Sequence, residues 1–444
     1  MVRRMTPLLL LALASPLLAQ TPPPLRAGLA TTIINPPTPA WLVGFAARSH
    51  PATTISLDLK AKALYLEQSP SRRALILTAD LLGFTERITN TLAQRALSKH
   101  GLARHQLFFF ASHTHSGPAV LDRLTLTVAD SPAFHAEAEA YTASLIDKLD
   151  RLITQALAKP KPVTLSSGWS SAPFAFNRRT EQLAAIRPGE SLPAPVDHRV
   201  PVLRLSRPNG QPLATLFGYA CHSTVLTGDT YEINGDYPGY AQQAIEEALP
   251  GSTAFFVLLA AGDQRATPRG TLLLAQQHGR TLARAVLDAS LSPLPPTLTT
   301  AIENIRLPFA SHTREAYLAE ANSSDVFAAR RGKAMLAAID DRRLPLNTPY
   351  PIQALRLGTL TLLALPGEVV VDYALTLRDK YGPNLITAAY ASHLPGYIPS
   401  LRLQREGGYE AGDAMMYFLQ PGWFTDEVEP LVLSAIQRLL ARLP

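Results

Sequence analysis

The feature that most constrains the fold is a recurring order in which a short apolar run is followed at once by polar residues. It occurs four times: "HTHSGP" follows residues 108–111, "CHST" follows 216–220, "GDQR" follows 255–261 and "PGE" follows 360–365. In open α/β sheets ligands bind beyond the carboxyl ends of the strands, which is where such clusters would lie. Because the clusters extend from residue 113 to residue 368, a shared site requires one large catalytic unit.

Strand-like runs alternate with helix-like segments along the chain, and this alternation indicates an α/β fold. Strands are predicted over residues 74–78, 107–111, 201–205, 214–220, 254–259 and 360–365. Helices are predicted over residues 85–100, 134–158, 240–249, 273–287, 314–340 and 369–380, and Gly101 and Pro160 stop the first two. Residues 159–200, rich in Pro, Ser and Gly, are predicted to wrap the surface or to rim a site.

The N-terminus has the pattern of a secretory signal peptide. Arg3 and Arg4 precede an apolar stretch over residues 8–18, and the small residue Ala19 follows. A membrane anchor is the alternative, but the stretch is short and Pro16 interrupts it. We therefore expect residues 1–19 to be removed, residues 20–444 to form the catalytic domain, and the protein to be exported to a periplasm or the extracellular space.

The amino-acid composition argues against some classes of binding partner. The formal net charge is +6, but Lys and Arg are scattered, without the dense basic block typical of nucleic-acid binding. The mild excess of positive charge leaves peripheral contact with an anionic membrane open. Cys221 is the one cysteine, so an intrachain disulfide is excluded, and we expect a packed, inert thiol.

The histidines indicate metal chemistry. In an extended segment His113 and His115 point the same way, and His222 offers a third imidazole after another strand. Zinc prefers nitrogen, oxygen or sulfur ligands, and Glu368 could supply a carboxylate. Each histidine taken alone could also be a hydrogen-bonding surface residue. Glu368 opens a predicted helix, where a carboxylate interacts well with the helix dipole, and that role is compatible with metal binding.

Ten short motifs occur in an order that resembles the neutral ceramidases, a family of non-lysosomal ceramidase-like zinc amidases. They are "TTIINPP", "GFAAR", "HTHSGP", "FNRRT", "GYACHSTVL", "INGDYPGYAQQAIE", "AAGDQRATPRG", "LPGEVVV", "LPGYIPS" and "GGYEAG". The last two contain Tyr397 and Tyr409, whose 12-residue separation is similar to that of the family. The resemblance implies mixed β-sheets flanked by helices in a single catalytic domain.

The resemblance also implies roles for individual residues. It implies a zinc ion, Zn2+, with four ligands: His113, His222, Glu368 and Tyr397. It places His115, Arg178 and Tyr409 around the scissile bond. It places Gly44 at the substrate entrance. A tyrosine ligand is unusual for zinc, and the residues alone would have left Tyr397 as an ordinary loop aromatic.

The implied roles are chemically reasonable. Zinc lowers the pKa of a bound water toward neutrality and polarises a carbonyl. His115 or Asp263 could take and return the proton, and Arg178 and the Tyr409 hydroxyl could donate to the developing oxyanion. Asp263 and Asp236 are also candidates for orienting the ligand histidines, although Asp236 could equally cap the helix that follows it.

Two departures from the family pattern qualify the expected substrate. Arg265 stands where ceramidases have a serine, and a guanidinium can bind a carboxylate or phosphate, so Arg265 is predicted to contact the substrate. The sequence ends 35 residues after Tyr409, so we expect the protein to differ from true ceramidases in lacking their C-terminal β-sandwich domain. Its last segment, "FTDEVEPLVLSAIQRLLARL", is predicted to be an amphipathic helix packed on the body, with membrane contact as the alternative.

These observations lead to one interpretation and two alternatives. The interpretation is an exported zinc-dependent amidohydrolase that cleaves the amide bond of an N-acyl lipid. The first alternative is a zinc hydrolase acting on another amide or ester, such as an anionic small molecule. The second is a non-catalytic binding protein that keeps the pocket without turnover.

Overall fold

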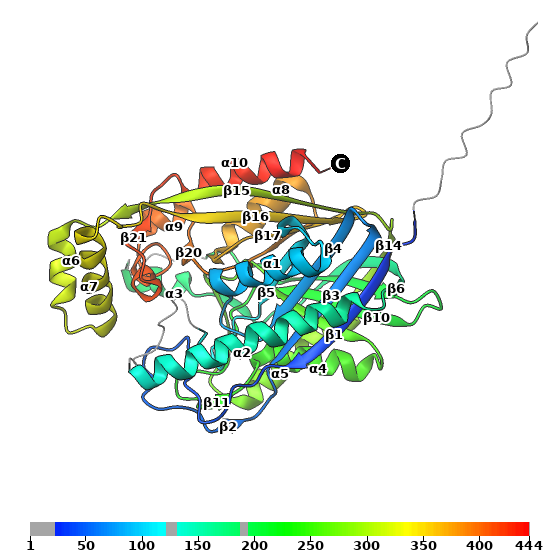
Figure 1. The fold of residues 1–444 in the computed structure, drawn as a ribbon, viewed down its shortest axis with the longest axis horizontal. Helices are drawn as coiled ribbons and strands as arrows, with labels where there is room; N and C mark the ends of the chain where they lie inside the picture. The colour runs from blue at the N-terminus through cyan, green and yellow to red at the C-terminus, as the bar shows by residue number, and fades with distance from the viewer. Residues whose placement is uncertain (1–22, 121–130, 187–193, 444) are drawn as a thin grey trace, which may run out of the picture.

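The computed structural model describes residues 23–120, 131–186 and 194–443, so the predicted signal peptide lies outside the described residues. Within these ranges the chain forms three five-stranded sheets, each covered by helices (Figure 1). The first sheet has the order β5-β4-β3-β1-β6, the second β12-β10-β9-β7-β14 and the third β19-β17-β16-β15-β21. This is the mixed α/β architecture that the sequence predicts.

The strands of each sheet come from one third of the chain. The first sheet contains β1 (Arg26–Ile33), β3 (Lys60–Ser69), β4 (Arg72–Ala79), β5 (Leu107–Ala111) and β6 (Lys161–Pro162). The second contains β7 (Thr164–Ser171), β9 (Arg199–Ser206), β10 (Pro212–Tyr219), β12 (Thr253–Leu258) and β14 (Ser290–Leu294). The third contains β15 (Leu298–Ser311), β16 (Asn347–Leu357), β17 (Leu360–Ala364), β19 (Leu385–Ala388) and β21 (Gly422–Phe424).

The three sheets share one construction. Described neighbours pair antiparallel except at one edge, where β4 pairs with β5, β10 with β12 and β17 with β19 in parallel. Parallel neighbours need a crossover connection. Each of these crossovers contains a helix: α1 (Glu86–His100), α4 (Asp236–Ala248) or α8 (Val371–Tyr381).

The parallel edge strands of the three sheets meet one another. Isolated backbone bridges join Phe110 to Ala391 and Leu259 to Ala388, which connects β5 and the end of β12 with β19 and the residues after it. The carboxyl ends of strands from all three sheets therefore come together, although their sequences are far apart. The fold thus brings the polar clusters that follow these strands to one place.

Two very short ribbons lie beyond the ends of the main strands. In one, β8 (Ala175–Asn177) pairs antiparallel with β13 (Gln264–Ala266). In the other, β18 (Glu368–Val369) pairs parallel with β20 (Tyr397–Ile398). A third short pair, β2 (Thr54–Ile55) with β11 (Glu232–Ile233), lies on the outside.

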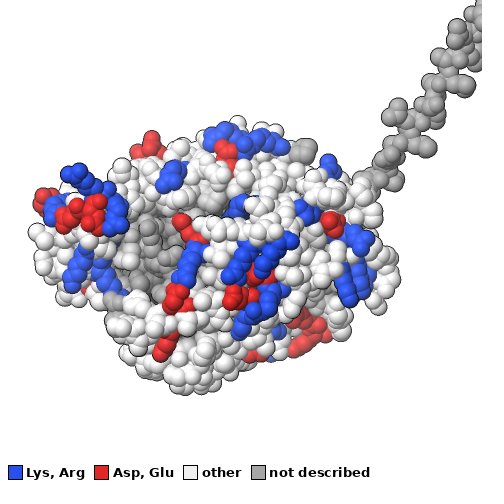
Figure 2. Space-filling view, viewed as in Figure 1, with Lys and Arg blue, Asp and Glu red and all other residues white. Residues whose placement is uncertain are grey.

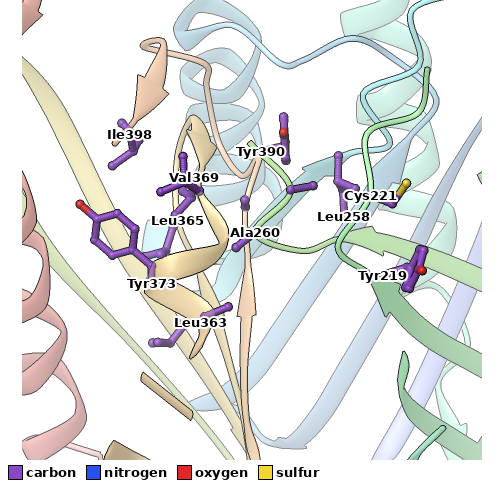
Figure 3. Packing of buried hydrophobic residues seen from close by; sticks show 14 of the residues in the cluster. Tyr219, Cys221, Leu258, Ala260, Leu363, Leu365, Val369, Tyr373, Tyr390 and Ile398 are labelled. Atoms are coloured by element: carbon purple, nitrogen blue, oxygen red, sulfur yellow. The ribbon is translucent and has the colours of Figure 1, made fainter. Parts of the chain in front are cut away.

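A continuous core supports these ribbons from below. Buried side chains of the second and third sheets, such as Tyr219, Leu258 and Leu363, belong to one cluster (Figure 3). Val369, Tyr397 and Ile398 of the β18–β20 ribbon are buried in the same cluster, which fixes the ribbon and with it Glu368, the register partner of Tyr397.

Cys221 belongs to the same core and directly precedes His222. It is a fully buried free thiol, and burial raises its pKa well above the usual value. The prediction of a packed, inert thiol is confirmed.

Most predicted elements are present with small shifts at their ends. The helix predicted over residues 85–100 is α1, which begins after its cap Thr85 and stops at Gly101 in the left-handed conformation, φ +63°. The helix predicted over residues 134–158 is α2 (Pro132–Leu157), which packs on the first sheet. The predicted C-terminal helix is α10 (Val428–Ala441), whose buried face packs on β15 and β16.

One sequence prediction is corrected and another is extended. The single helix predicted over residues 314–340 is a pair, α6 (Arg314–Ala321) and α7 (Val326–Asp340), because Asp325 accepts hydrogen bonds from the first backbone amides of α7 and starts a new helix. The two helices pack against each other at the left of Figure 1. Residues 159–200, predicted to wrap the surface or to rim a site, also supply strand β7 of the second sheet.

The remaining helices are α3 (Arg179–Ile186), α5 (Leu272–Leu287) and α9 (Leu401–Glu406), and α4 and α5 cover the second sheet. None of the helices in the described ranges combines the length and apolar character needed to span a bilayer. On the face shown in Figure 2, acidic and basic side chains are interspersed over the helices and separated by uncharged areas.

Candidate active site

Two buried histidines, His113 and His222, use the same ring nitrogen, Nδ1, to contact backbone carbonyl oxygens. His113 follows β5 with a left-handed backbone, φ +57°, and its Nδ1 lies 2.6 Å from the carbonyl oxygen of Leu82. His222 follows β10, and its Nδ1 lies 2.7 Å from the carbonyl oxygen of Ala261 and 3.1 Å from that of Gln264. Because a carbonyl can only accept, both Nδ1 atoms carry the proton, and Nε2 is the remaining lone pair of each neutral ring.

Glu368 faces both of these lone pairs. It pairs with Tyr397 across the β18–β20 ribbon, and its Oε2 lies 2.9 Å from His222 Nε2 and 3.4 Å from His113 Nε2. A carboxylate and an imidazole lone pair both accept, so they need a positive charge between them, either a proton or a metal ion. Burial and then Arg178 lower the pKa of His222, which disfavours the proton.

His115 completes a cluster of three imidazoles. Its Nε2 lies 3.1 Å from His113 Nε2, and one ring nitrogen from each of His113, His115 and His222 falls within 4.8 Å of the others. Burial, followed by the two neighbouring histidines, lowers the pKa of His115 well below its usual value. The ring is therefore neutral near pH 7 and available as a proton acceptor.

The loop that contains Gly44 packs directly on His115. Gly44 has φ +103°, and a Cβ at this position would lie 2.5 Å from His115 Nδ1, so both the conformation and the space require glycine. The buried Arg48 guanidinium donates to the carbonyl oxygens of His115, at 2.5 Å, and Val43, at 3.2 Å. The structure thus places Gly44 directly against His115, a candidate catalytic group.

Arg178 lies beside the aromatic part of the site. Its Nη2 donates to the Tyr397 hydroxyl at 2.9 Å and to the carbonyl oxygen of Gly262 at 2.7 Å. Its guanidinium carbon lies 5.6 Å from the centre of the Tyr397 ring and 5.5 Å from that of Tyr409. The two tyrosine rings meet edge to face, and Tyr409 remains 38% exposed, so it lines an open side of the site.

Asp263 lies under the site. Its Oδ1 accepts from the backbone amide of Val371 at 2.9 Å, and its Oδ2 accepts from Asn177 Nδ2 at 2.7 Å. Burial raises the pKa of Asp263 to about 6. In the described part of the chain neither oxygen is hydrogen-bonded to a histidine, so its observed contacts join α8 to the β8–β13 ribbon.

The backbone of Arg265 lies beside that of His222, but its guanidinium forms an ion pair with Glu181. An isolated bridge pairs it with His222. Its Nη2 donates to both carboxylate oxygens of Glu181 in α3, at 2.8 and 2.7 Å, and its guanidinium carbon lies 5.5 Å from the Phe176 ring. The predicted anion-binding group is thus already paired with an anionic side chain of the protein.

Sequence reasoning did not identify Tyr390 or Glu410. Tyr390 has φ +54°, its ring centre lies 4.4 Å from that of His113, and its hydroxyl donates to Glu368 Oε2 at 3.4 Å. It follows the apolar run of β19, so the rule that found the other polar clusters could have found it. Glu410 directly follows Tyr409 and contacts Arg178, and no local pattern marks it.

The donor set fits a transition-metal ion. Two imidazole Nε2 atoms, oriented through Nδ1–H contacts to carbonyls, and one carboxylate face each other in a buried place, and zinc sites are built from such ligands. The fold and the site therefore define an α/β protein with a buried imidazole–carboxylate cluster at the junction of three sheets. The family follows from comparison with known proteins.

The chain belongs to the family described as neutral/alkaline non-lysosomal ceramidase, N-terminal, whose model matches residues 30–267. Neutral ceramidase B of Dictyostelium discoideum is 24% identical over 225 residues, which are 47% of this chain and 30% of that protein. Neutral ceramidase A of the same organism is 23% identical over 240 residues, 50% of this chain and 32% of that protein. The matched stretch thus spans about a third of the length of these curated relatives.

Solved structures extend the likeness in fold to nearly the whole chain. The crystal structure of neutral ceramidase from Pseudomonas aeruginosa has a TM-score of 0.74 at 18% identity, covering 95% of this chain and 75% of that one. A structure described as ceramidase complexed with C2 gives the same TM-score at 17% identity, covering 95% and 76%. The third sheet, which lies beyond the match of the family model, is therefore included in the structural likeness.

Proposed function

We propose that this chain is an exported zinc-dependent hydrolase that cleaves the amide bond of an N-acyl lipid of the ceramide type. The observation that carries the proposal is the convergence of His113, His222 and Glu368, from all three sheets, into one buried donor set. Membership of the ceramidase family supports the reaction class and the lipid substrate. Export rests on the signal-peptide pattern of residues 1–19.

The residues that would hold the ion are His113, His222, Glu368 and Tyr397. Glu368 and Tyr397 are register partners on one ribbon, and the Tyr397 ring stacks on that of His222 with 6.5 Å between the ring centres. When bound, zinc polarises a carbonyl group and lowers the pKa of a coordinated water.

The other groups of the site can perform the remaining tasks. His115 is neutral and lies beside His113, so it can accept the proton of an attacking water and return it to the leaving amine. Arg178 can donate to the oxygen that becomes negative as the amide carbonyl turns tetrahedral. Tyr409 lies next to Arg178 at an exposed position, where its hydroxyl can contact the same part of a substrate.

The proposal is tested with the variant His222→Ala in the purified protein. We expect the bound zinc to be lost and the release of fatty acid from a fluorescent N-acyl sphingosine to fall by at least about a hundredfold, the scale of losing one preorganised contact to the transition state. Metal content is measured by mass spectrometry and the fold by circular dichroism. A matched control is His100→Ala at the end of α1, which should retain both metal and turnover.

Each other outcome has a definite meaning. Full activity in His222→Ala would remove this residue from the ligand set. Bound zinc in the unmodified protein without turnover of any N-acyl lipid would redirect the search to another amide or ester. A protein that binds no metal under any loading condition would be a binding protein rather than an enzyme.

A further inference from the structure

We propose that Glu410, held by Arg179, is a positioning residue that fixes the Arg178 guanidinium for catalysis. The inference rests on the proposed hydrolase function and concerns the three side chains Arg178, Glu410 and Arg179, which we call the arginine clamp. Glu410 and Arg179 do not belong to the candidate donor set for the metal, and neither lies in a strand of the three sheets.

The carboxylate of Glu410 is shared between two arginines. Its Oε1 accepts from Arg178 Nε at 2.6 Å, and its Oε2 accepts from Arg179 Nη1 at 3.1 Å. The side chains of Glu410 and Arg179 are both 0% exposed, so neither contact is weakened by water. Hydrogen bonds between charged groups are about twice as strong as neutral ones, and a guanidinium offers them in a fixed planar geometry.

The contact with Glu410 determines how Arg178 is oriented. Nε is bound to Glu410, while Nη2 is bound to Gly262 and Tyr397, so two edges of the planar group are fixed. Among the described residues the side-chain hydrogen bonds of Arg178 use Nε and Nη2 and none uses Nη1, and the side chain is 18% exposed. The arginine clamp therefore leaves one nitrogen free to donate to a substrate oxygen.

Arg179 anchors the clamp to the rest of the protein. Its Nη2 donates to Glu406 Oε2 at 2.9 Å in α9, and its Nη1 also donates to Gln182 Oε1 at 2.9 Å in α3. A chain of contacts thus runs from α9 through Arg179 and Glu410 to Arg178 and then to the Tyr397 hydroxyl. A rigid, preformed donor costs no reorganisation when charge develops in the transition state.

A buried ion pair is an expensive way to add stability. Desolvation of the charges often cancels their attraction, and apolar residues of similar volume can stabilise a core equally well. Two buried charged groups that orient a third, as Glu410 and Arg179 orient Arg178, are expected where the geometry of the third group matters more than stability. The contact of Arg178 with Tyr397, a candidate metal ligand, marks this as such a place.

The first test is the isosteric variant Glu410→Gln. An amide offers one acceptor oxygen instead of two, so one of the two guanidinium contacts is lost. We expect kcat for N-acyl sphingosine to fall about tenfold to a hundredfold, somewhat less than the loss of a whole oxyanion donor, with KM and zinc content unchanged. The matched control is Glu303→Gln, whose carboxylate also accepts from two arginines, Arg438 and Arg442, but belongs to neither the arginine clamp nor the candidate site; it should keep kcat close to that of the unmodified protein.

The second test separates positioning from a general loss of structure. In an Arg178→Ala background the same Glu410→Gln change should cause no further fall in kcat, because Glu410 acts through Arg178. An equal fold-loss in both backgrounds would overturn the proposal, as would a normal kcat in the single variant.

A third measurement does not depend on turnover. In the nitrogen-15 spectrum of arginine-labelled protein, the Nε–H signal of Arg178, assigned with the variant Arg178→Lys, should be protected from exchange with solvent and lose this protection in Glu410→Gln. If the unmodified protein hydrolyses no N-acyl lipid, the proposed function fails, and this signal still decides whether the clamp fixes Arg178. An Arg178 signal unchanged by Glu410→Gln would overturn the inference even in an active enzyme.

Discussion

Glu410 and Asp263 both carry buried carboxylates beside the candidate site, yet their pKa values move in opposite directions. Glu410 accepts from the guanidinium groups of Arg178 and Arg179, whereas Asp263 accepts from the side-chain amide of Asn177 and a backbone amide. Burial opposes ionisation of both. For Glu410 the two arginines outweigh burial and lower the pKa, while for Asp263 burial prevails and raises the pKa to about 6.

The comparison shows that the partner, rather than burial, decides whether a buried carboxyl group is charged. A guanidinium supplies a full positive charge, which favours the ionised form of Glu410 and lowers its pKa. An amide supplies only a dipole, so Asp263 can take up a proton in mildly acidic solution. The exposed pair of Arg265 and Glu181 is a third case, in which water reduces the effect of the charges.

The largest expected effect is the loss of stability in Arg179→Ala. This change leaves Glu410 with one arginine and removes a contact of Glu406, so we expect the free energy of unfolding to fall by about 3 kcal/mol, the lower end of the range for breaking a buried ion pair. Guanidinium chloride unfolding at pH 7 measures this value. A change below about 1 kcal/mol would show that the buried contact behaves like a surface one.

The next effect concerns the pH dependence of stability. Because the folded-state pKa of Asp263 is raised to about 6, the folded protein binds more protons than the unfolded one between about pH 4 and pH 6. Asp263 therefore stabilises the folded protein by up to roughly 3 kcal/mol below about pH 4, and this stabilisation is lost as the pH rises through 6.

Asp263→Asn should remove this part of the pH dependence. The decline in unfolding free energy between about pH 4 and pH 7 should be smaller in the variant than in the unmodified protein. Part of the decline should remain, because burial also raises the pKa of Asp236 to about 6. Identical profiles for both proteins would mean that Asp263 is ionised in the folded state throughout.

The smallest effect is expected for Arg265→Ser. Its partner Glu181 has a side chain that is 62% exposed, and exposed ion pairs contribute at most about 1 kcal/mol. The same unfolding measurement should thus give a value within about 1 kcal/mol of the unmodified protein. A loss as large as that of Arg179→Ala would contradict the distinction between buried and exposed pairs.

Local patterns predicted much of the fold and half of the site. Runs such as residues 107–111 are apolar enough to be strands in any context, and polar residues directly after them placed His113, His222 and Glu368 at one edge. Tyr397 and Tyr409 could be assigned only through the resemblance to a family. Tyr397 lies in a strand of two residues and Tyr409 in a turn, and neither is long enough to leave a periodic signal.

Other features could not be predicted, because they depend on distant parts of the chain. Arg179 and Glu410 are 231 residues apart, and nothing in the sequence around either residue indicates the other. Contacts of this kind arise only when the three sheets pack together. By contrast, the prediction of one helix over residues 314–340 overlooked a break between α6 and α7 that is visible locally, because residues 322–325 are four consecutive polar residues and Asp325 is a typical helix cap.

The meeting of β5, β12 and β19 has a consequence for assembly. The polypeptide must have brought its early, middle and late portions into register before His113, His222 and Glu368 can share a single cation. An intermediate that has completed only its first two sheets would display the imidazoles without the carboxylate. Under the proposed function, the ion would bind only after the third sheet has formed, and it would then connect residues from all three sheets.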